Sequence, residues 1–500
     1  MKRNNAGAVS VLLCFVFLAL IIAVGAAGDV SGLAAANAYA QRISYLSCKS
    51  VLAEYDRNLF DDYGLLAFVG GSDEIEERIG DYSSMMRRVD EQSEDEIVFF
   101  DVRLKDVNAD CRERNLRNPA VFMEQIKEYM KYSAAESGIE GLLGLASGSL
   151  GFEDALNNAI VGFEKEEQDK AAAGSSGSGE GGFGTEAEGG GAGAGEGREP
   201  VDVNDRCSDT SVDCMERVLR SRRIIDSLPS GSDNEESEKH EYSLGKEKEL
   251  LKLGKDSSEF LNSFCSALGG GAEKLILCEY IMDSFKNTVN PESIDGETFF
   301  TNEAEYILKG GFNDRKNASS VKRDLFLLRT ALNIAHIYSD AEKSRIVLEA
   351  ASAAGPYAAA VQFVLAAAWA GAEAQEDLNI LYSGGKVSFI KSSGDWKLDF
   401  DSVFGEGKVI NSDYRGDRGL DYSGYLRLML LAQSRENLIE RSMDLIQINM
   451  KGRYNIQFDL RNCCTGFSVH TEYERLWYLP AVLPGIVEDN VLSYEEVYSY

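Results

Sequence analysis

The stretch AVSVLLCFVFLALIIAVGAA, residues 8–27, sets the topology of this chain, because Ser10 is its only clearly polar side chain. At about 1.5 Å per residue, about 20 helical residues span the hydrocarbon core of a bilayer, which is about 30 Å thick. Lys2 and Arg3 precede the stretch and Asp29 follows it. Positive charge marks the cytoplasmic side, so the pattern predicts a single-pass cell-membrane protein with a cytoplasmic N-terminus and an extracellular C-terminal domain.

A cleaved signal peptide is the alternative interpretation, since Ala38-Tyr39-Ala40 has the small-x-small form of a cleavage site. The apolar core of a signal peptide is usually about 7–15 residues, and this stretch is longer. Alanine-rich sequence with helical spacing continues beyond it. We therefore expect one helix from about residue 8 to about residue 60, which favours an uncleaved anchor in membrane lipid.

The segment Gly7-Ala8-Val9-Ser10-Val11, placed between a short basic leader and the apolar stretch, resembles the TadE/TadG-like proteins. These are pseudopilin-type components of Tad (tight adherence) pilus systems. The resemblance implies a pilin-like N-terminal helix, Tad pilus or secretion machinery as partners, and a prepilin-type cleavage between Gly7 and Ala8. The chain departs from the family at Leu12, the fifth position after this glycine, where pilin-like precursors typically carry Glu.

A second resemblance covers most of the chain. It is to a clostridial-type bacterial family of unknown function that combines a TadE-like anchor with a large extracellular part. This resemblance implies no activity. The segments that carry it are residues 51–56, 61–65, 323–329, 394–396, 423–428 and 443–450.

The fold class predicted for the chain is α+β and mainly helical, with short antiparallel strands after the long N-terminal helix. Residues 171–200 hold 12 of the 48 glycines, so they cannot bury enough apolar surface to order themselves. The predicted division is a cytoplasmic stub (1–7), a transmembrane helix (8–28), its extracellular continuation (29–65), the first part of the extracellular domain (66–170), a disordered Gly/Ser/Glu-rich linker (171–240) and the main α+β domain (241–500).

Local patterns predict several elements of the extracellular part. Strands are expected over residues 96–107 and 454–473, and a hairpin over 387–400 with its turn at 392–395. Helices are expected after Pro119, after a capping box at 339–342, and over 357–372 and 421–450. The apolar helix over 357–372 is too short and too rich in alanine for a second membrane span, so we interpret it as buried.

The formal net charge is −31, and 44% of the residues are hydrophobic. A surface this acidic repels nucleic acid, so nucleic acid is excluded as a partner. Only three histidines occur, at 240, 336 and 470, and no H-E-x-x-H, G-x-S-x-G or G-x-x-x-x-G-K-[ST] motif is present. Residues 411–416 begin like a calcium loop, but Arg415 and Tyr422 stand at ligand positions.

These observations predict no catalytic, cofactor-binding or metal-binding residue. The favoured function is a non-enzymatic, membrane-anchored surface protein of pilin-like or Tad-associated type. Two alternatives stay open. One is a membrane-tethered hydrolase acting on envelope polymers, which needs two converging carboxylates. The other is an extracellular receptor or binding protein, which needs a membrane partner because the cytoplasmic stub carries no signalling domain.

Eight of the nine cysteines follow the apolar stretch, where disulfides are permitted if the domain is extracellular. Cys207 and Cys214 lie close in a polar segment, and Cys265 and Cys278 flank a triple glycine, so these are the two preferred bridges. Residues 463 and 464 are adjacent cysteines, and each is expected to pair elsewhere or stay free. The alternative is that all of these thiols stay reduced.

Overall fold

The chain forms two compact units: unit 1 contains residues 1–125 and 455–500, and unit 2 contains residues 126–454. Unit 2 is thus inserted between the two segments of unit 1. The predicted linker, residues 171–240, lies outside the described part of the chain. The computed structural model describes residues 6–91, 100–137, 247–267, 271–290, 298–352, 355, 358–404, 418–477 and 490–500.

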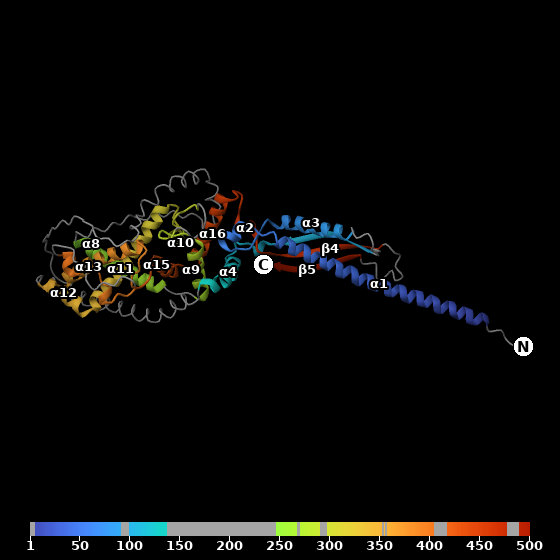
Figure 1. Cartoon of the computed structure of the whole chain (residues 1–500), viewed down its shortest axis with the longest axis horizontal. Coiled ribbons are helices and arrows are strands. Elements are labelled where there is room, and N and C mark those ends of the chain that lie inside the picture. The colour runs from blue at the N-terminus through green and yellow to red at the C-terminus, as the bar shows by residue number, and fades with distance from the viewer. Residues whose placement is uncertain are drawn as a thin grey trace, which may run out of the picture. The chain divides into compact units, whose positions relative to one another are not determined.

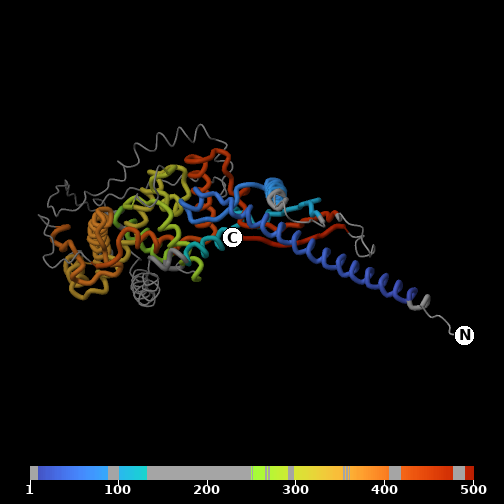
Figure 2. Tube along the Cα trace, turned by 45° about the vertical axis from the view of Figure 1, so that its right-hand side comes forward, coloured from blue at the N-terminus to red at the C-terminus, as the bar shows by residue number. Residues whose placement is uncertain are grey.

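Unit 1 is built on a long helix and a three-stranded antiparallel sheet. The helix is α1 (Ala6–Leu52), and the sheet has the order β2-β4-β5, formed by β2 (Phe100–Asp110), β4 (Gly466–Trp477) and β5 (Val491–Ser499). Both β2 and β5 pair with β4 in antiparallel register. The blue helix α1 lies beside the red strands β4 and β5 in both views (Figures 1 and 2).

The smaller elements of unit 1 complete its core. β1 (Phe68–Val69) pairs with β3 (Cys463–Cys464), and α3 (Ser72–Glu91) packs on both α1 and β2. The buried side chains at this junction are Cys48, Val51, Leu52, Phe68, Ile75, Ile79, Ala109, Cys111, Cys464, Phe467, Val469 and Tyr498. Unit 1 also contains α2 (Arg57–Tyr63), η1 (Arg112–Arg114) and η4 (Leu460–Asn462).

Unit 2 is helical in the part that the structure describes. Its helices are α8 (Glu247–Ala267), α9 (Ala272–Ser284), α10 (Glu303–Lys309), α11 (Asp314–Ser339), α12 (Ala341–Ala351), α13 (Ala358–Tyr382), α14 (Phe400–Phe404), α15 (Tyr422–Leu431) and α16 (Arg435–Arg453). Helix α4 (Pro119–Ser137) begins in unit 1, at the proline where the sequence predicts a start.

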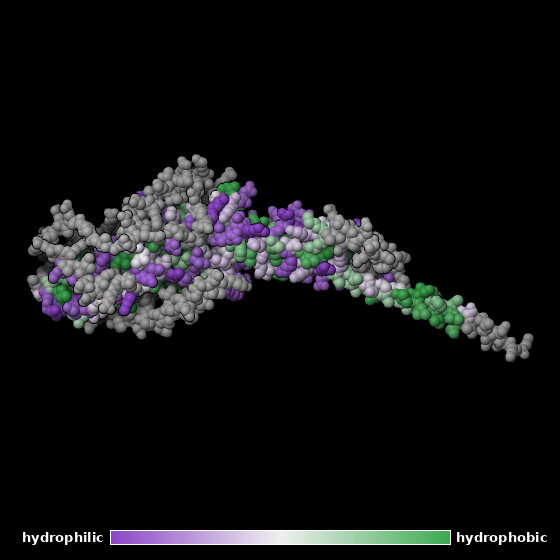
Figure 3. Space-filling model, viewed as in Figure 1, coloured by the Kyte–Doolittle hydropathy of each residue, from purple (hydrophilic) through white to green (hydrophobic). Residues whose placement is uncertain are grey.

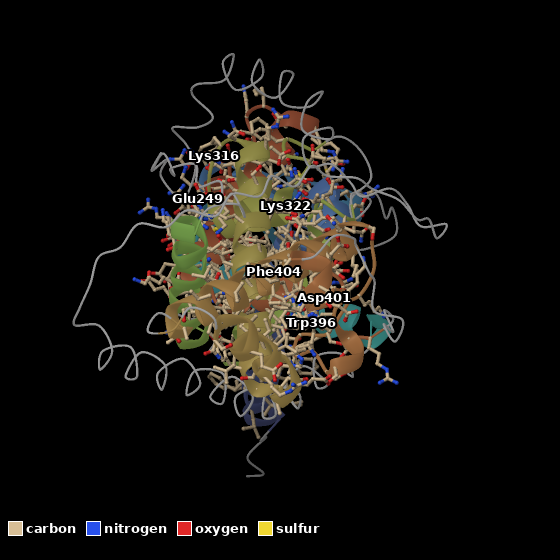
Figure 4. The ribbon with its side chains drawn as sticks, turned by 90° about the vertical axis from the view of Figure 1, so that its left-hand side faces the viewer. Glu249, Lys316, Lys322, Trp396, Asp401 and Phe404 are labelled. Atoms are coloured by element: carbon tan, nitrogen blue, oxygen red, sulfur yellow. The ribbon has the colours of Figure 1, made fainter. Side chains whose placement is uncertain are left out.

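Helix α13 forms the centre of unit 2, because it packs on α8, α11, α12 and α14. Alanines at 366, 367 and 370 are buried in this core and allow close approach of the neighbouring helices. Trp369 packs edge-on against Trp396, with ring centroids 5.5 Å apart, and Trp396 and Phe404 are both labelled in Figure 4. The apolar helix predicted over 357–372 is therefore a buried core helix, and it continues to Tyr382.

The α+β, mainly helical fold class is confirmed, with a long N-terminal helix and short antiparallel strands. The domain division differs from the predicted one, because residues 455–500 belong with the N-terminal residues and not with residues 241–454. The reason is strand pairing at long range. Lys105 in β2, for example, bonds to Glu472 in β4 across 367 positions of sequence.

The N-terminal helix ends earlier than the predicted residue 60. Helix α1 stops at Leu52, and α2 begins after Asp56, whose carboxylate caps it by accepting a hydrogen bond from the backbone N–H of Leu59 at 3.1 Å. Gly64 closes α2 in the left-handed conformation, at φ 65°. The prediction missed this N-cap and C-cap pair and extended the helix through it.

Two predictions in unit 2 are wrong. The segment over 387–400 is no hairpin: its turn residues form η3 (Ser393–Asp395), and Val387 pairs instead with Leu420 as an isolated bridge. The single helix over 421–450 is two helices, because Ser434 caps the start of α16.

Two further boundaries move by a few residues. The capping box over 339–342 places the cap on Ser339, whereas Asp340 is the residue that caps α12. The strand expected over 96–107 is β2, and residues 96–99 lie outside the described part.

Candidate functional site

The N-terminal part of α1 is exposed and apolar. Its large hydrophobic side chains stand in solvent from Val11 to Val24, among them Leu12 at 64% and Phe15 at 66% exposure. The most apolar 18-residue window has a mean hydropathy of 2.8, and none of it is buried. This end of α1 is the green segment in Figure 3. The helix is thus long and apolar enough to cross a membrane, and water is an unfavourable surrounding for it.

The C-terminal part of α1 packs on the sheet of unit 1. Ala36, Ala40 and Ile43 face β2, β4 and β5, and they are buried against Val102 and Tyr473. Their spacing of three and four residues keeps them on one face of the helix. Alanine at two of these positions brings the helix backbone close to the strands. One continuous helix therefore has an exposed apolar part and a part fixed in a domain core.

Side-chain hydrogen bonds also join α1 to the sheet. The hydroxyls of Ser44 and Thr471 lie 3.1 Å apart, so the helix is bonded to the central strand β4. The Tyr494 hydroxyl donates to the backbone carbonyl of Asn37 at 2.9 Å. The buried bond to Thr471 and the exposed bond from Tyr494 together fix both the rotation and the register of α1 on the sheet.

The predicted prepilin-type site lies at the start of this helix. Gly7 and Ala8 are both within α1, which begins at Ala6. Of the four cysteines of the predicted disulfides, Cys207 and Cys214 lie outside the described residues. Cys278 is buried in α9. The side chain of Cys265 in α8 lies outside the described part of the chain, so the bridge between them stays a prediction.

Unit 2 contains a buried network of charges that sequence reasoning missed. Arg329 on α11 is fully buried, and its Nε lies 3.0 Å from Asp377 Oδ2 on α13. Lys391 Nζ lies 2.6 Å from Asp377 Oδ1 and also bonds to Glu373. Two cations thus balance two carboxylates, which removes most of the cost of burying them.

The remaining donors and acceptors of this network go to the backbone and to one tyrosine. Arg329 Nη1 donates to the carbonyl oxygens of Ser388 and Phe389 at 3.0 and 2.9 Å, and to the Tyr425 hydroxyl at 2.9 Å. Burial raises the pKa of Tyr425 to about 12. The network links α11, α13, α15 and the segment after α13, so it stabilises the core of unit 2.

A second buried group in unit 2 consists of carboxylates. Glu303 accepts from Lys286 N at 2.9 Å and from Asn449 Nδ2 at 2.6 Å, and burial raises its pKa to about 7. Glu305 accepts from the Tyr422 hydroxyl at 2.6 Å, and burial raises its pKa as well. Both carboxylates accept hydrogen bonds from residues of unit 2, as carboxylates with a structural role do.

An open recess in unit 1 is also lined by carboxylates, among them Glu54, Asp56 and Glu74, and its volume is about 360 Å³. These three carboxylates are already used: Glu54 accepts from Tyr82, Asp56 caps α2, and Glu74 accepts from the backbone N–H of Gly71. Among the described residues, no group of three His, Cys, Asp or Glu side chains is arranged to hold a metal ion.

These features define a class: a mainly helical α+β protein with one N-terminal helix that is able to span a membrane. Residues 209–475 match the model of a family of unknown function (DUF5702), and the chain belongs to that family. The match covers most of unit 2 and strand β4 and leaves out α1. No curated protein matches the chain, and no solved structure matches it.

Proposed function

We propose that this protein is a non-enzymatic, single-pass membrane protein of the cell surface, and that it acts as a pilin-like component of a Tad pilus or secretion assembly. One observation carries the proposal: α1 is a single helix whose apolar N-terminal part is exposed and whose C-terminal part is locked into a sheet. Membrane lipid is the partner of the exposed part.

The length of α1 supports a membrane-spanning N-terminal part and a C-terminal part that packs on the sheet. The helix has 47 residues, which at about 1.5 Å each make roughly 70 Å. A bilayer core takes about 30 Å of that length. The remainder matches the part of α1 that packs on the sheet, so the boundary between membrane and domain falls near Asp29. Lys2 and Arg3 at the other end favour a cytoplasmic N-terminus.

The chemistry of the buried groups supports a structural role. Arg329, Asp377 and Glu303 are enclosed and hydrogen-bonded within unit 2, whereas catalytic carboxylates must reach a substrate. The TadE/TadG-like resemblance of residues 7–11 supports the narrower assignment to a pilus or secretion assembly.

The membrane assignment is tested with two arginines in the exposed apolar part, Phe17→Arg and Ile21→Arg. Each charge at the centre of a span costs about 2.5–3.5 kcal/mol on insertion scales. We expect the double variant to leave the carbonate-washed membrane fraction while the wild type stays. The control is Met85→Arg with Leu348→Arg, at residues exposed to a similar degree in α3 and α12. A double variant that stays in the washed membrane contradicts the proposal.

The orientation is tested with protease added to intact cells or wall-stripped protoplasts. We expect a C-terminal tag to be digested and a fragment containing α1 to stay in the membrane. A protected tag refutes the extracellular location.

The pilin-like part of the proposal is tested through Cys14, an exposed thiol on the apolar part of α1. Pilin-like assembly brings the N-terminal helices of neighbouring copies together, so oxidation in membranes with copper phenanthroline should give a cross-linked dimer. The matched control is Cys14→Ser, which should not cross-link in this way. If dimer formation is the same in both proteins, or absent in both, the apolar parts of α1 from neighbouring copies do not meet at Cys14 and the pilin-like role fails.

A further inference from the structure

Two cysteines that are distant in sequence meet in the core of unit 1. Cys111 directly follows β2, and Cys464 ends the short strand β3. They are 6% and 1% exposed and belong to one apolar cluster. Each thiol is near enough to the other to shift its pKa. The two cysteines are therefore neighbours within one buried cluster.

The same turn covers both sulfurs. The Ser72 hydroxyl lies 3.6 Å from the Cys111 sulfur, and the Cys464 thiol donates to the carbonyl oxygen of Gly70 at 3.2 Å. Gly70 and Gly71 connect β1 to α3, and Ser72 is the first residue of α3. This turn therefore contacts both thiols.

The backbones beside the two cysteines are already fixed at a short separation. The backbone N–H of Thr465 donates to Arg114 O at 2.8 Å, and Asn115 forms an isolated antiparallel bridge with Cys464. A disulfide requires Cα atoms about 4.4–6.8 Å apart, the range of neighbouring strands. These contacts hold the segment that follows Cys111 beside Cys464.

The two thiols also differ in acidity, as an exchange reaction requires. The neighbouring Cys464 thiol lowers the pKa of Cys111 to about 6, and Cys111 in turn raises the pKa of Cys464. Burial instead raises the pKa of Cys48 and of Cys278 to about 12 in each case. Cys111 is thus the nucleophile among these buried thiols.

We propose that Cys111 and Cys464 are a redox pair that closes to an intramolecular disulfide. This bond joins the strand before the insertion to the strand after it, so it closes a loop that contains the whole of unit 2. It holds the two segments of unit 1 together covalently. The pairing is a property of unit 1 alone and does not depend on the location or function proposed above.

The reaction is a thiol–disulfide exchange with a small-molecule disulfide such as oxidised glutathione. The Cys111 thiolate attacks one sulfur of the oxidant, forms a mixed disulfide and releases the first glutathione thiolate. The Cys464 thiol loses its proton and attacks the Cys111 sulfur, which releases the second glutathione. The protein loses two protons and two electrons, and the oxidant's sulfur–sulfur bond takes up both electrons.

The test uses the full chain, purified in detergent and equilibrated with oxidised glutathione. Free thiols are then alkylated under denaturing conditions and the peptides are mapped without reduction. We expect a linked peptide pair containing Cys111 and Cys464. Cys111→Ser and Cys464→Ser should each remove it, and the matched control Cys463→Ser, at the neighbouring buried cysteine, should retain it.

A second readout is thermal. Closing a long loop stabilises the native state, so the oxidised wild type should melt on the order of 5–10 °C above the reduced form. Cys111→Ser should show no such difference between oxidising and reducing conditions. Alkylation of both thiols after oxidation, a bridge from Cys111 to Cys463 or Cys48, or an equal thermal shift in Cys111→Ser would each overturn the proposal.

Discussion

The charge network around Arg329 allows a quantitative prediction for the variant Arg329→Met. The guanidinium is fully buried and contacts Asp377 twice, through Nε at 3.0 Å and Nη2 at 2.9 Å. Methionine retains most of the volume and removes the charge and every donor. The substitution therefore tests the polar network and leaves the apolar packing nearly unchanged.

The expected loss of stability follows from the buried polar groups that lose Arg329 as a partner. Among the described residues, Lys391 is the cationic partner that Asp377 and Glu373 keep, and removing one member of a buried charge pair costs about 3–5 kcal/mol. The carbonyl oxygens of Ser388 and Phe389 also lose their donor, at about 1–3 kcal/mol for each group that stays dry. We expect the free energy of unfolding of unit 2 to fall by about 4 kcal/mol or more.

The assay is urea unfolding followed by tryptophan fluorescence. Trp369 and Trp396 are buried in unit 2, so a Trp477→Phe background removes the signal from unit 1. The midpoint should shift down by more than about 1 M urea. The matched control is Arg345→Met, whose partner Glu349 lies 2.7 Å away on the surface of α12.

The control should cost at most about 0.5 kcal/mol, because an exposed pair of this kind contributes little. If Arg329→Met destabilises unit 2 no more than Arg345→Met does, the network contributes nothing net and our account of the core is refuted. Arg329→Lys separates charge from geometry. It keeps the charge and loses the two-pronged contact with Asp377, so we expect about half the loss.

Three further predictions concern pH and backbone packing. Burial raises the pKa of Glu303 from its ordinary 4.5 to about 7. The contribution of Glu303 to stability is therefore full below pH 4.5 and is lost as the pH rises towards 7. Over this window the melting temperature of the wild type should fall more than that of Glu303→Gln. Burial lowers the pKa of His336 from 6.5 to about 4, so its contribution is full above pH 6.5 and is lost as the pH falls towards 4; His336→Phe should lessen the decrease in melting temperature over that acid range. A Cβ at Gly466 would lie 2.5 Å from the carbonyl oxygen of Tyr498, so Gly466→Ala should cost about 1–3 kcal/mol in urea unfolding. A Cβ at Gly80 meets nothing within 4 Å, so the control Gly80→Ala should stabilise its helix by up to about 1 kcal/mol. Equal effects of the two substitutions would contradict the strand packing.

The N-terminal helix could be predicted because its signal is local. Composition and spacing alone identify residues 8–27, and α1 indeed runs through them without interruption. The break after Leu52 was also readable, since Asp56 and Gly64 are a matched N-cap and C-cap. The prediction gave more weight to apolar spacing than to these two residues.

The false hairpin over 387–400 has a different cause. The backbone N–H groups of Lys397 and Leu398 donate at 2.8 Å to the two carboxylate oxygens of Glu373, a residue on α13. The Glu373 carboxylate thus accepts the hydrogen bonds that the backbone carbonyls of a partner strand would accept in a hairpin. The alternating pattern in the sequence is real, and nothing local indicates where its hydrogen bonds go.

The buried groups could not be predicted for the same reason. Arg329 and Lys391 are indistinguishable in sequence from the many charged residues of an acidic chain, and only packing places them together. Cys111 and Cys464 come together because their strands lie in one unit across the whole insertion. Short sequence separation, the basis of the predicted disulfides, gives no information about this pair.

The order in which the sheet is assembled has a consequence for biosynthesis. The central strand β4 and its neighbour β5 follow unit 2 in the chain, whereas α1 and β2 precede it. During synthesis α1 therefore leaves the ribosome long before the strands that cover Ala36, Ala40 and Ile43 do. In that interval this face of the helix is open to chaperones and to other nascent chains. A nascent chain that stalls before residue 466 would present α1 without the central strand β4 on which this face packs.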